Sequence, residues 1–406
     1  MTRQARLCDY GIWHKACSHL LLCVEHWASS IFRMGQSVGE GVSCSLVSAT
    51  RFFSFPYIED GTMQGHDIIV IGASVGGVEA LSNLVAQFPE DLPATIFVVQ
   101  HVTPTATGHL AQILNRAGPL PATMAQDCES FEPGHIYVAL PDHHLLVKQG
   151  CLRVTRGLRE NRVRPAIDPL FRSAAVAYGT RVVGVVLTGL QNDGTSGLLA
   201  IKRCGGIAMV QDPTDALYPD MPRSALEHIE VDYCVPVLKM GALLYRLSQE
   251  PPRETPPIPE ELHIEVNIAE SPTDNSNCAE KLGESVPVMC PECGGPLWEL
   301  RDEKLRRYRC RIGHAFTAES LLAGQSEALE YALWAAVRTM EDRVRILMTL
   351  ASGRQEHGQS KIADMYETRA KELKSHAQQI RQMLLETAKS STTPFFPSVP
   401  PFPQGE

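Results

Sequence analysis

Apolar, strand-like runs that alternate with helical patterns between about residues 67 and 247 constrain the fold of this chain most strongly. Residues 67–72 (DIIVIG) are too apolar for a half-exposed strand, and 95–99 (TIFVV) and 182–188 (VVGVVLT) repeat this pattern. Residues 78–88 and 197–204 show the apolar spacing of helices. This order of elements predicts an α/β domain with a mainly parallel sheet.

The composition of the 406 residues narrows the classes of function. The net charge of -9 argues against nucleic acid as the main partner, which would favour a basic surface. No run reaches the length of a membrane span, so we expect no direct insertion into a membrane. The twelve cysteines are scattered, and three have the spacing of a metal site, which favours the reducing cytoplasm as the location.

The N-terminal leader, residues 1–62, lacks sustained periodicity and is about half as long as a typical domain. Met63 lies four residues before the first strand run. We hypothesise that Met63 is the natural start and that the α/β domain occupies 63–247. A poorly ordered extension is the alternative.

Four further segments follow the α/β domain. Between Glu250 and Glu284 nine acidic residues stand against two basic ones, and Pro, Ser and Asn are frequent, as in a solvated linker. We therefore predict an acidic linker over 248–286, a Cys/His module over 287–318, a helical hairpin over 319–388 and a disordered tail over 389–406.

The Cys/His module contains Cys290, Cys293, Cys310 and His314 in the pattern C-x2-C, sixteen residues, C-x3-H. Four such ligands satisfy tetrahedral Zn²⁺ and leave no position for a catalytic water, so a structural zinc ion in a zinc-ribbon-like module is predicted. Chance spacing is the alternative. If the site is structural, chelation should unfold the module while sparing the α/β domain.

The predicted hairpin has one apolar seam on each helix. Leu329, Leu333 and Val337 begin the first seam with steps of four, and Leu373, Ala377 and Leu384 belong to the second. Gly353 and Gly358 lie between the two helices. The seams can close on each other or pair with another helix, and the sequence leaves both possibilities and the oligomeric state open.

Ser74 lies in a glycine-rich turn, GASVGG (72–77), between the first strand run and a helix. Small neighbours permit a sharp turn that exposes a nucleophilic hydroxyl at the carboxyl end of the sheet, where amides that open the helix would face an oxyanion. A phosphate-binding turn or simple tight packing is the alternative. The spacing is neither that of a dinucleotide turn nor that of a P-loop.

His101 directly follows a predicted strand, and Asp193 lies just beyond another. Because parallel strands end at one sheet edge, a Ser, a His and an Asp from three strand ends can converge. Taken singly, His101 is an ordinary loop residue and Asp193 a helix N-cap. The chain order Ser, His, Asp differs from the Ser, Asp, His of α/β-hydrolases.

Five blocks of the chain, in order, resemble the catalytic domain of the chemotaxis protein-glutamate methylesterases (CheB). The resemblance covers about 67–247 and implies a doubly wound, mainly parallel sheet. The blocks are IGASVGG (71–77), VVQHVTP (98–104), RPAIDPLFRSAA (164–175), VVLTGLQNDGTSG (185–197) and YPDMPRSAL (218–226).

The resemblance implies Ser74 as nucleophile, His101 as general base and Asp193 as the carboxylate that orients the imidazole. Backbone amides near Val75, Gly76 and Leu190 are expected to hold the oxyanion. The expected reaction is hydrolysis of glutamyl methyl esters on a receptor or other signalling protein, without a cofactor for catalysis. Deamidation of glutamine is a second expected activity, because glutamine presents the same carbonyl.

Two departures from the family bear on regulation. Members usually have Thr where this chain has Val75, so a hydroxyl role is lost there. Members also commonly carry a phosphorylated receiver domain, and the leader is too short for one. Activation in cis is therefore not expected, and the target need not be a chemotaxis receptor.

Several charged residues in or near these blocks are open to two interpretations. Arg162, Arg164, Arg172 and Arg223 can meet an acidic partner helix, but solvated or ion-paired arginines are commoner. His143 and His144 follow a probable turn and are expected at the surface.

Two other functions are alternatives to the esterase. A catalytically inactive adaptor would bind its partner through the C-terminal half, but such a domain need not retain Ser74, His101 and Asp193 together. A nucleotide-binding oxidoreductase needs a phosphate turn and a ribose-binding acid, which the sequence lacks.

Overall fold

The computed structural model describes residues 65–254, 256–270, 278–301 and 305–390. The predicted leader, the proposed start at Met63 and residues 391–406 of the predicted tail lie outside these segments. Across the described segments, no helix combines the length and apolar character needed to span a membrane.

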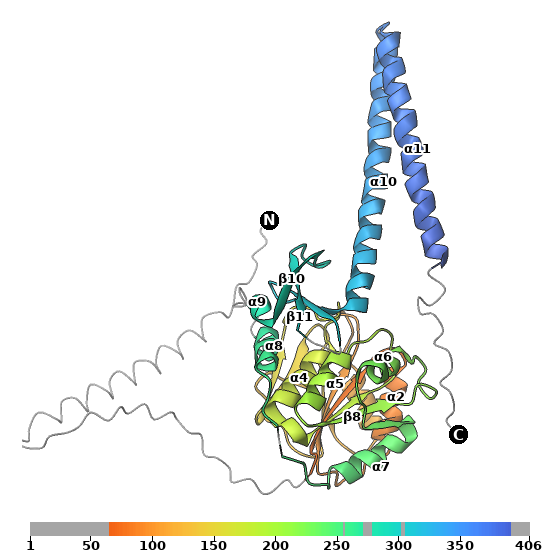
Figure 1. The fold of residues 1–406 in the computed structure, drawn as a ribbon. Coiled ribbons are helices and arrows are strands. Elements are labelled where there is room, and N and C mark those ends of the chain that lie inside the picture. Colours follow the sequence, from red (N-terminus) through yellow and green to blue (C-terminus); the bar gives the residue numbers. More distant parts are fainter. Residues whose placement is uncertain (1–64, 255, 271–277, 302–304, 391–406) are drawn as a thin grey trace, which may run out of the picture. The chain divides into compact units, whose positions relative to one another are not determined.

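A seven-stranded parallel sheet forms the centre of the α/β region (Figure 1). The chain passes from the central strand β1 to one side and later returns to its other side. The carboxyl ends of β1, β2 and β7 therefore border the switch point at which open α/β sheets bind ligands. In sheet order the strands are β3 (Ala122–Met124), β4 (Ile136–Val138), β2 (Thr95–Gln100), β1 (Ile68–Ala73), β7 (Val182–Val186), β8 (Ile207–Gln211) and β9 (Tyr233–Val235).

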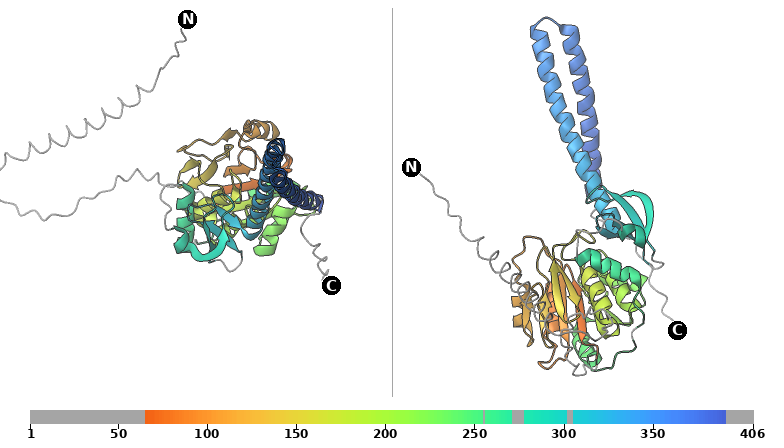
Figure 2. Two further views of the ribbon diagram at one scale, coloured as in Figure 1. Left: turned by 90° about the horizontal axis from the view of Figure 1, so that it is seen from above. Right: turned by 90° about the vertical axis from the view of Figure 1, so that its left-hand side faces the viewer.

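Helices cover both faces of this sheet (Figure 2). Successive residues of β1 point to opposite faces, so Ile69 and Ile71 enter one core and Ile68 and Val70 the other. The prediction of a doubly wound, mainly parallel α/β fold is confirmed. The first core contains α2 (Gly77–Val85), α3 (Leu110–Ala117) and α7 (Val237–Leu247); the second contains α4 (Ile167–Tyr178), α5 (Thr195–Arg203) and α6 (Asp220–His228).

Two smaller elements pack against α4. The antiparallel hairpin of β5 (His144–Lys148) and β6 (Cys151–Thr155) lies outside the main sheet. Helix α8 (Glu260–Glu270) lies in the segment predicted to be a solvated linker, yet Leu262, Glu265 and Ile268 are buried. The structure differs from the prediction because acidic composition does not reveal which carboxylates are buried against arginines.

The C-terminal module begins after α9 (Cys278–Leu282) with a four-stranded antiparallel sheet. Its small core contains Leu297, Phe316 and Leu321 together with two cysteines. Thr317 caps the helix that follows, because its side chain accepts a hydrogen bond from the Ser320 amide. The strands are β10 (Gly283–Met289), β11 (Pro296–Leu300), β12 (Arg307–Cys310) and β13 (Ala315–Thr317).

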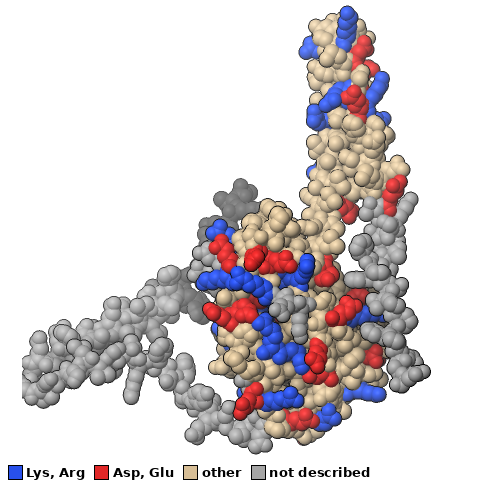
Figure 3. All heavy atoms as spheres, in the orientation of Figure 1, with Lys and Arg blue, Asp and Glu red and all other residues tan. Residues whose placement is uncertain are grey.

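Helices α10 (Ala318–Glu356) and α11 (Ser360–Ser390) form the predicted helical hairpin and lie side by side in both figures. Val337, Leu373, Ala377 and Leu384 are buried between them, so the seams close within the chain. Leu329, in contrast, is exposed. Figure 3 shows that the charged side chains on this face of the hairpin gather mainly near its turn.

Candidate active site

Ser74 stands at the carboxyl end of β1, in the turn to α2. Its amide donates to Thr188 O at 3.0 Å, and its carbonyl accepts from Gly77 N at 2.9 Å and from the Gln100 side chain at 2.6 Å. Gly76 adopts a φ of 78°, which suits glycine. These contacts fix the backbone of the turn and hold the serine hydroxyl at the sheet edge.

Close packing around Ser74 requires a second glycine. A Cβ atom on Gly189, which follows Thr188 beyond β7, would come within 2.7 Å of the Ser74 Cβ. The backbone after β7 therefore passes directly against the serine. This approach unites the ends of β1 and β7 in one site, as the sequence predicts for residues at neighbouring strand ends.

Ser74, His101 and Asp193 form one hydrogen-bonded chain. His101 Nδ1 lies 3.1 Å from Ser74 Oγ, and His101 Nε2 lies 2.8 Å from Asp193 Oδ2. A proton on Nε2 donated to the carboxylate leaves Nδ1 as an acceptor for the serine hydroxyl. Asp193 and Ser74 are both buried, while 14% of the His101 side chain is exposed. The structure brings together all three residues that the sequence singled out.

The environment of Asp193 favours its charged form. Burial alone would raise its pKa, but the hydrogen bond and charge of His101 outweigh burial and lower the pKa below its ordinary value. The Ile167 amide, 2.7 Å from Oδ2, and the Asn161 side chain, 2.9 Å from Oδ1, contribute to this lowering. The carboxylate is thus an anion surrounded mainly by neutral donors.

Asp168 lies beside Asp193 and behaves in the opposite way. Burial, and then the negative charge of Asp193, raise its pKa well above the ordinary value. It accepts hydrogen bonds from the amides of Gly194 and Gly197 at 3.0 and 2.6 Å, which tie α4 to the start of α5. Of the two carboxyl groups, Asp193 therefore carries the negative charge.

Comparison with known proteins places this geometry in a family. A family profile described as CheB methylesterase matches residues 69–244. A protein of Leptospira interrogans, provisionally named a protein-glutamate methylesterase/protein-glutamine glutaminase, is 38% identical over 187 residues, which are 46% of this chain and 97% of that protein.

The chain belongs to the CheB methylesterase family. The resemblance predicted from the five sequence blocks is therefore confirmed. The protein-glutamate methylesterase/protein-glutamine glutaminase of Photorhabdus laumondii is 37% identical over 183 residues, which are 44% of this chain and 52% of that protein. The crystal structure of the Thermotoga maritima CheB methylesterase catalytic domain is 34% identical, covers 45% of this chain and 98% of that one, and has a TM-score of 0.43.

The predicted oxyanion donors of this CheB-family site lie in the two turns beside the serine. Within the described segments, the backbone amides of Val75, Gly76 and Leu190 have no acceptor. The side chains of Val75 and Leu190 are 42% and 44% exposed, so both turns reach the surface. These amides are therefore open to a bound group, and their role stays a prediction.

The arginines near the CheB-family blocks are largely ion-paired within the chain. Arg164 pairs with Asp142 at 2.6 Å, and Arg172 with Glu160 at 2.8 Å. Arg162 does meet an acidic residue on a helix, but this residue is Glu327 of α10 in the same chain. The ion-paired interpretation thus holds for these three.

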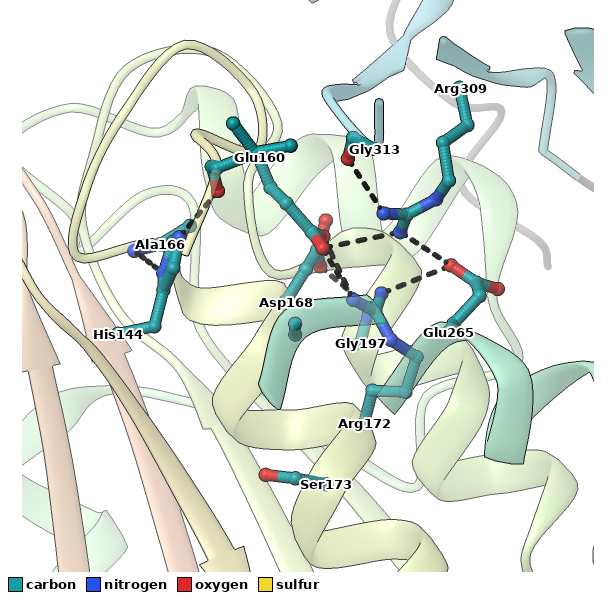
Figure 4. Close-up of polar contacts among 12 residues, drawn as sticks. His144, Glu160, Ala166, Asp168, Arg172, Ser173, Gly197, Glu265, Arg309 and Gly313 are labelled. Carbon is teal, nitrogen blue, oxygen red and sulfur yellow. Dashed lines mark hydrogen bonds and ion pairs between the residues drawn. The ribbon is translucent and has the colours of Figure 1, made fainter. Parts of the chain in front are cut away.

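His144 differs from the sequence prediction because it is buried rather than at the surface. Its ring accepts from the Ala166 amide at 3.2 Å and bonds Leu158 O at 2.8 Å (Figure 4). Burial lowers its pKa, which favours the neutral ring that this pattern needs. The histidine therefore fastens both ends of the loop that contains Asn161.

A buried ion-pair cluster joins this loop and α4 to α8 and the C-terminal module. We call Glu160, Arg172, Glu265, Arg307 and Arg309 the ion-pair cluster. Figure 4 shows Arg172 and Arg309 each directed toward both Glu160 and Glu265, and the separations are 2.8–3.3 Å. Arg307 adds a contact to Glu265 at 2.9 Å. Burial raises the pKa of Glu265, but the three arginines outweigh it and leave the pKa well below its ordinary value.

The four donors of the C-terminal Cys/His set converge. The donor atoms of Cys290, Cys293, Cys310 and His314 all lie within 4.8 Å of one another. The sulfurs of Cys293 and Cys310 are 3.8 Å apart, and His314 Nδ1 is 3.5 Å from Cys310 Sγ. Ligands bound tetrahedrally to Zn²⁺ at about 2.3 Å for sulfur and 2.0–2.1 Å for nitrogen are separated by about 3.5–3.8 Å. The geometry fits a four-ligand metal ion.

Sequence reasoning missed the polar residues that surround the triad. Gln100 braces the serine turn, and Asn161 and Asn192 link Asp193 and its loop to the C-terminal module. Gln100 precedes His101 in the block VVQHVTP (98–104), so its position at a strand end is a signal that the sequence contains. Asn161 lies in an irregular loop and has no such signal.

Proposed function

We propose that this protein is a protein-glutamate methylesterase that hydrolyses glutamyl methyl esters on a signalling protein. Its membership of the CheB methylesterase family supports the reaction class. The observation that carries the proposal is the hydrogen-bonded chain from Ser74 through His101 to Asp193. A nucleophile, a base and a charged orienting group are the parts that acyl transfer requires.

The first half-reaction forms an acyl-enzyme. Ser74 Oγ attacks the γ-carbonyl carbon of the ester while His101 Nδ1 accepts the serine proton. Negative charge develops on the carbonyl oxygen, toward which the amides of Val75, Gly76 and Leu190 donate. The tetrahedral intermediate then collapses, its bond to the methoxy oxygen breaks, and His101 gives its proton to the departing methanol.

The second half-reaction regenerates the serine. Water replaces methanol, His101 accepts a water proton, and the resulting hydroxide attacks the glutamyl-serine ester. The bond to Ser74 Oγ breaks and His101 returns the proton to it. The net change is ester plus water to carboxylic acid plus methanol. Throughout, Asp193 stays ionised and stabilises the imidazolium, in agreement with the lowered pKa of its carboxyl group.

Deamidation of glutamine is the second activity that we propose for this site. The names of the Leptospira and Photorhabdus relatives pair methylesterase with glutaminase. A glutamine side chain presents the same γ-carbonyl with ammonia as the leaving group, so the same residues act on it.

Methanol release tests the proposed function. The full chain is incubated with a chemoreceptor cytoplasmic fragment that carries labelled glutamyl methyl esters, and volatile label is collected. Ser74→Ala should lower the rate by about 10⁶-fold, because the nucleophile is lost. Ser82→Ala is the matched control, since the Ser82 hydroxyl bonds only to Val78 O on α2.

Two outcomes would contradict the proposal. Equal methanol release by Ser74→Ala and the wild type would show that another group performs the reaction. A wild-type chain that is neither active nor labelled at Ser74 by a fluorophosphonate would favour the catalytically inactive adaptor.

We further propose that the Cys/His set holds a structural Zn²⁺. Three thiolates and one imidazole are ligands that zinc prefers, and their separations support a closed tetrahedral site. The ion would tie β12 and the turn before β13 to the Cys290–Cys293 knuckle. No step of the hydrolysis needs this ion. Location in the cytoplasm and a methylated receptor as substrate complete the proposal, in agreement with the family.

A further inference from the structure

Asn161 connects the triad carboxylate to the C-terminal module. Its side-chain nitrogen donates to Asp193 Oδ1 at 2.9 Å and to Asp168 Oδ2 at 2.8 Å. Its side-chain oxygen accepts from Thr317 N at 3.1 Å and from Ser320 Oγ at 3.0 Å. Both hydrogens and the oxygen of the amide are therefore used, and only the oxygen faces the module.

The backbone of Asn161 is attached to the same part of the module. Its amide donates to Ala315 O at 2.8 Å, at the start of β13. The residue is 3% exposed and has a φ of 49°, a left-handed conformation that Asn adopts more readily than most residues. Water therefore has little access to the amide, and the loop cannot place another side chain there without change.

The contacts from Thr317 and Ser320 decide which way the amide points. An Asn side chain can rotate so that its oxygen and nitrogen exchange places. In the rotated state the oxygen would face the charged carboxylate of Asp193, and the nitrogen would face the Thr317 N–H. Both interactions are repulsive. Without the two donors, the oxygen in the observed state would be buried and unsatisfied, which is also unfavourable.

A second contact reaches the residue before the triad carboxylate. Asn192 accepts from Thr317 Oγ1 at 2.9 Å and donates to Glu319 at 2.7 Å. The start of α10 thus contacts both Asn161, which bonds the Asp193 carboxylate, and Asn192, which precedes Asp193 in the chain. A displacement of this turn would remove hydrogen bonds from both neighbours of the carboxylate.

We infer that Asn161 is a positioning residue for Asp193, and that Thr317 and Ser320 of the C-terminal module hold its amide in the orientation that catalysis uses. The inference rests on the proposed function, because it names a positioning residue for the same triad. The module is then part of the catalytic apparatus rather than a separate recognition element. Asn161 does not touch substrate; it acts through the carboxylate that orients His101.

The experiment compares three variants of the full chain. Ser320→Ala removes one donor to the Asn161 oxygen and also the hydroxyl that accepts from the Thr317 amide at 2.9 Å in the capping box of α10. Ser326→Ala is the matched control on the same helix, where the exposed hydroxyl bonds to Leu322 O and to no other described residue. Asn161→Asp keeps a side chain that tolerates the left-handed backbone but removes both donors to the carboxylates.

Two readouts report on the triad independently of the natural substrate. The first is inactivation by a fluorophosphonate probe, from which the maximal rate of Ser74 labelling and the half-saturating probe concentration are obtained separately. The second is the downfield proton resonance of the His101 N–H that bonds to Asp193, assigned by its loss in His101→Gln. Loss of fold alone would lower the labelled fraction and would not shift the resonance of the folded protein.

Ser320→Ala should lower the maximal labelling rate by about 3- to 10-fold, the size of effect expected for one neutral hydrogen bond. Asn161→Asp should lower it by about 10- to 100-fold, the size expected for a hydrogen bond to a charged group. The half-saturating concentration should stay unchanged in both, because neither residue contacts the probe. The resonance should move upfield in both variants and stay in place in Ser326→Ala.

Contrary results separate the inference from the proposed function. If Ser74 is labelled in the wild type but Ser320→Ala matches Ser326→Ala in rate and resonance, the inference is overturned and the esterase stands. If the wild type is not labelled, the proposed function fails, and an unmoved His101 resonance in Ser320→Ala then overturns the inference as well. Should Asn161→Asp not fold, Ser320→Ala still decides.

Discussion

Two sets of buried charges in this protein are stabilised against the loss of hydration in opposite ways. At the sheet edge, the Asp193 carboxylate is surrounded mainly by neutral donors and by an imidazole. In the ion-pair cluster, Glu160 and Glu265 are met by the permanent charges of Arg172, Arg307 and Arg309. Both arrangements compensate for lost hydration, but only the first leaves a neighbouring group free to gain and lose a proton.

The difference teaches what a reactive carboxylate needs around it. An arginine at Asp193 would neutralise the charge that must stabilise the imidazolium of His101 during acyl transfer. The hydrogen bond and charge of His101, with the neutral donors, keep the carboxylate ionised, and these donors leave its electrostatic effect on the imidazole intact. The ion-pair cluster stabilises no imidazolium. Its arginines can therefore neutralise Glu160 and Glu265 and hold the Glu160 loop to the module without affecting the reaction.

The largest effect should come from neutralising the reactive carboxylate. Asp193→Asn should lower the rate of methanol release by about 10,000-fold, because the imidazole loses its orienting charge and its tautomer. The thermal midpoint should change far less than the rate. Asp364→Asn, exposed on α11, is the control. If Asp193→Asn lowered the rate of methanol release by less than about tenfold, the charge of Asp193 would not have the catalytic role that distinguishes it from the ion-pair cluster.

Removing one charge from the ion-pair cluster should act on stability instead. Glu265→Gln should lower the free energy of unfolding by about 3–5 kcal/mol, because three buried arginines lose a counter-charge. Glu261→Gln on the same helix is the matched control: its pair with Arg203 is partly exposed, and its loss should cost about 1 kcal/mol or less. Denaturant titration measures both, and equal values would contradict a special role for the cluster.

The same glutamate predicts how stability depends on pH. Burial raises the pKa of Glu265, but the arginines outweigh it, so the folded pKa lies well below the unfolded one. The stabilisation is therefore complete above the unfolded pKa of about 4.3, and is lost as pH falls toward the folded pKa. Between about pH 5 and pH 3, the wild type should lose more unfolding free energy than Glu265→Gln. If the unfolding free energies of the two proteins fell equally over this pH range, the lowered pKa of Glu265 would be contradicted.

Disrupting the proposed metal site should have a smaller effect on the rate. Cys293→Ser should lower bound zinc, measured by mass spectrometry, and should slow Ser74 labelling by about tenfold, because His314 lies three residues before Thr317. Cys234→Ser, an exposed free cysteine, is the control. The sequence alone predicts that loss of zinc leaves the hydrolase unaffected. An unchanged rate of Ser74 labelling in a variant that has lost zinc would support that prediction instead.

The smallest effect is expected at Val75. Its side chain is 42% exposed, and only its backbone amide is proposed to act. Val75→Thr should therefore change the rate of methanol release by less than about threefold. A larger increase would indicate that a hydroxyl at this position contributes to the reaction and that its loss here matters.

The sequence predicted the sheet and the triad for a common physical reason. Buried parallel strands are recognisable because both of their faces are apolar, and their carboxyl ends share one edge. Ser74 and His101 each follow such a strand directly and Asp193 lies in the turn beyond a third, so their convergence could be inferred. The spacing of the cysteines and His314 likewise depends on local geometry and predicted a Cys/His set.

The contacts between distant segments could not be predicted in this way. Glu265 lies in an acidic stretch whose composition suggests solvent, and only the folded chain reveals the arginines that bury it. Asn161 lies in a loop without periodicity, and its side-chain partners in the C-terminal module are more than 150 positions away. Such pairs depend on how two segments pack, which no single segment encodes.

The side-chain amide of Asn161, which bonds both Asp193 and the C-terminal module, limits where this chain can be truncated without affecting the triad. The family profile ends at residue 244, yet two of the donors that orient Asn161 lie at 317 and 320. A fragment trimmed to the profile would lack both donors, so water would replace them at the Asn161 oxygen and the orientation of the amide beside Asp193 would no longer be held. In chemical terms the hydrolase of this chain extends as far as the first turn of α10, so its working boundary is a set of hydrogen bonds rather than a position in an alignment.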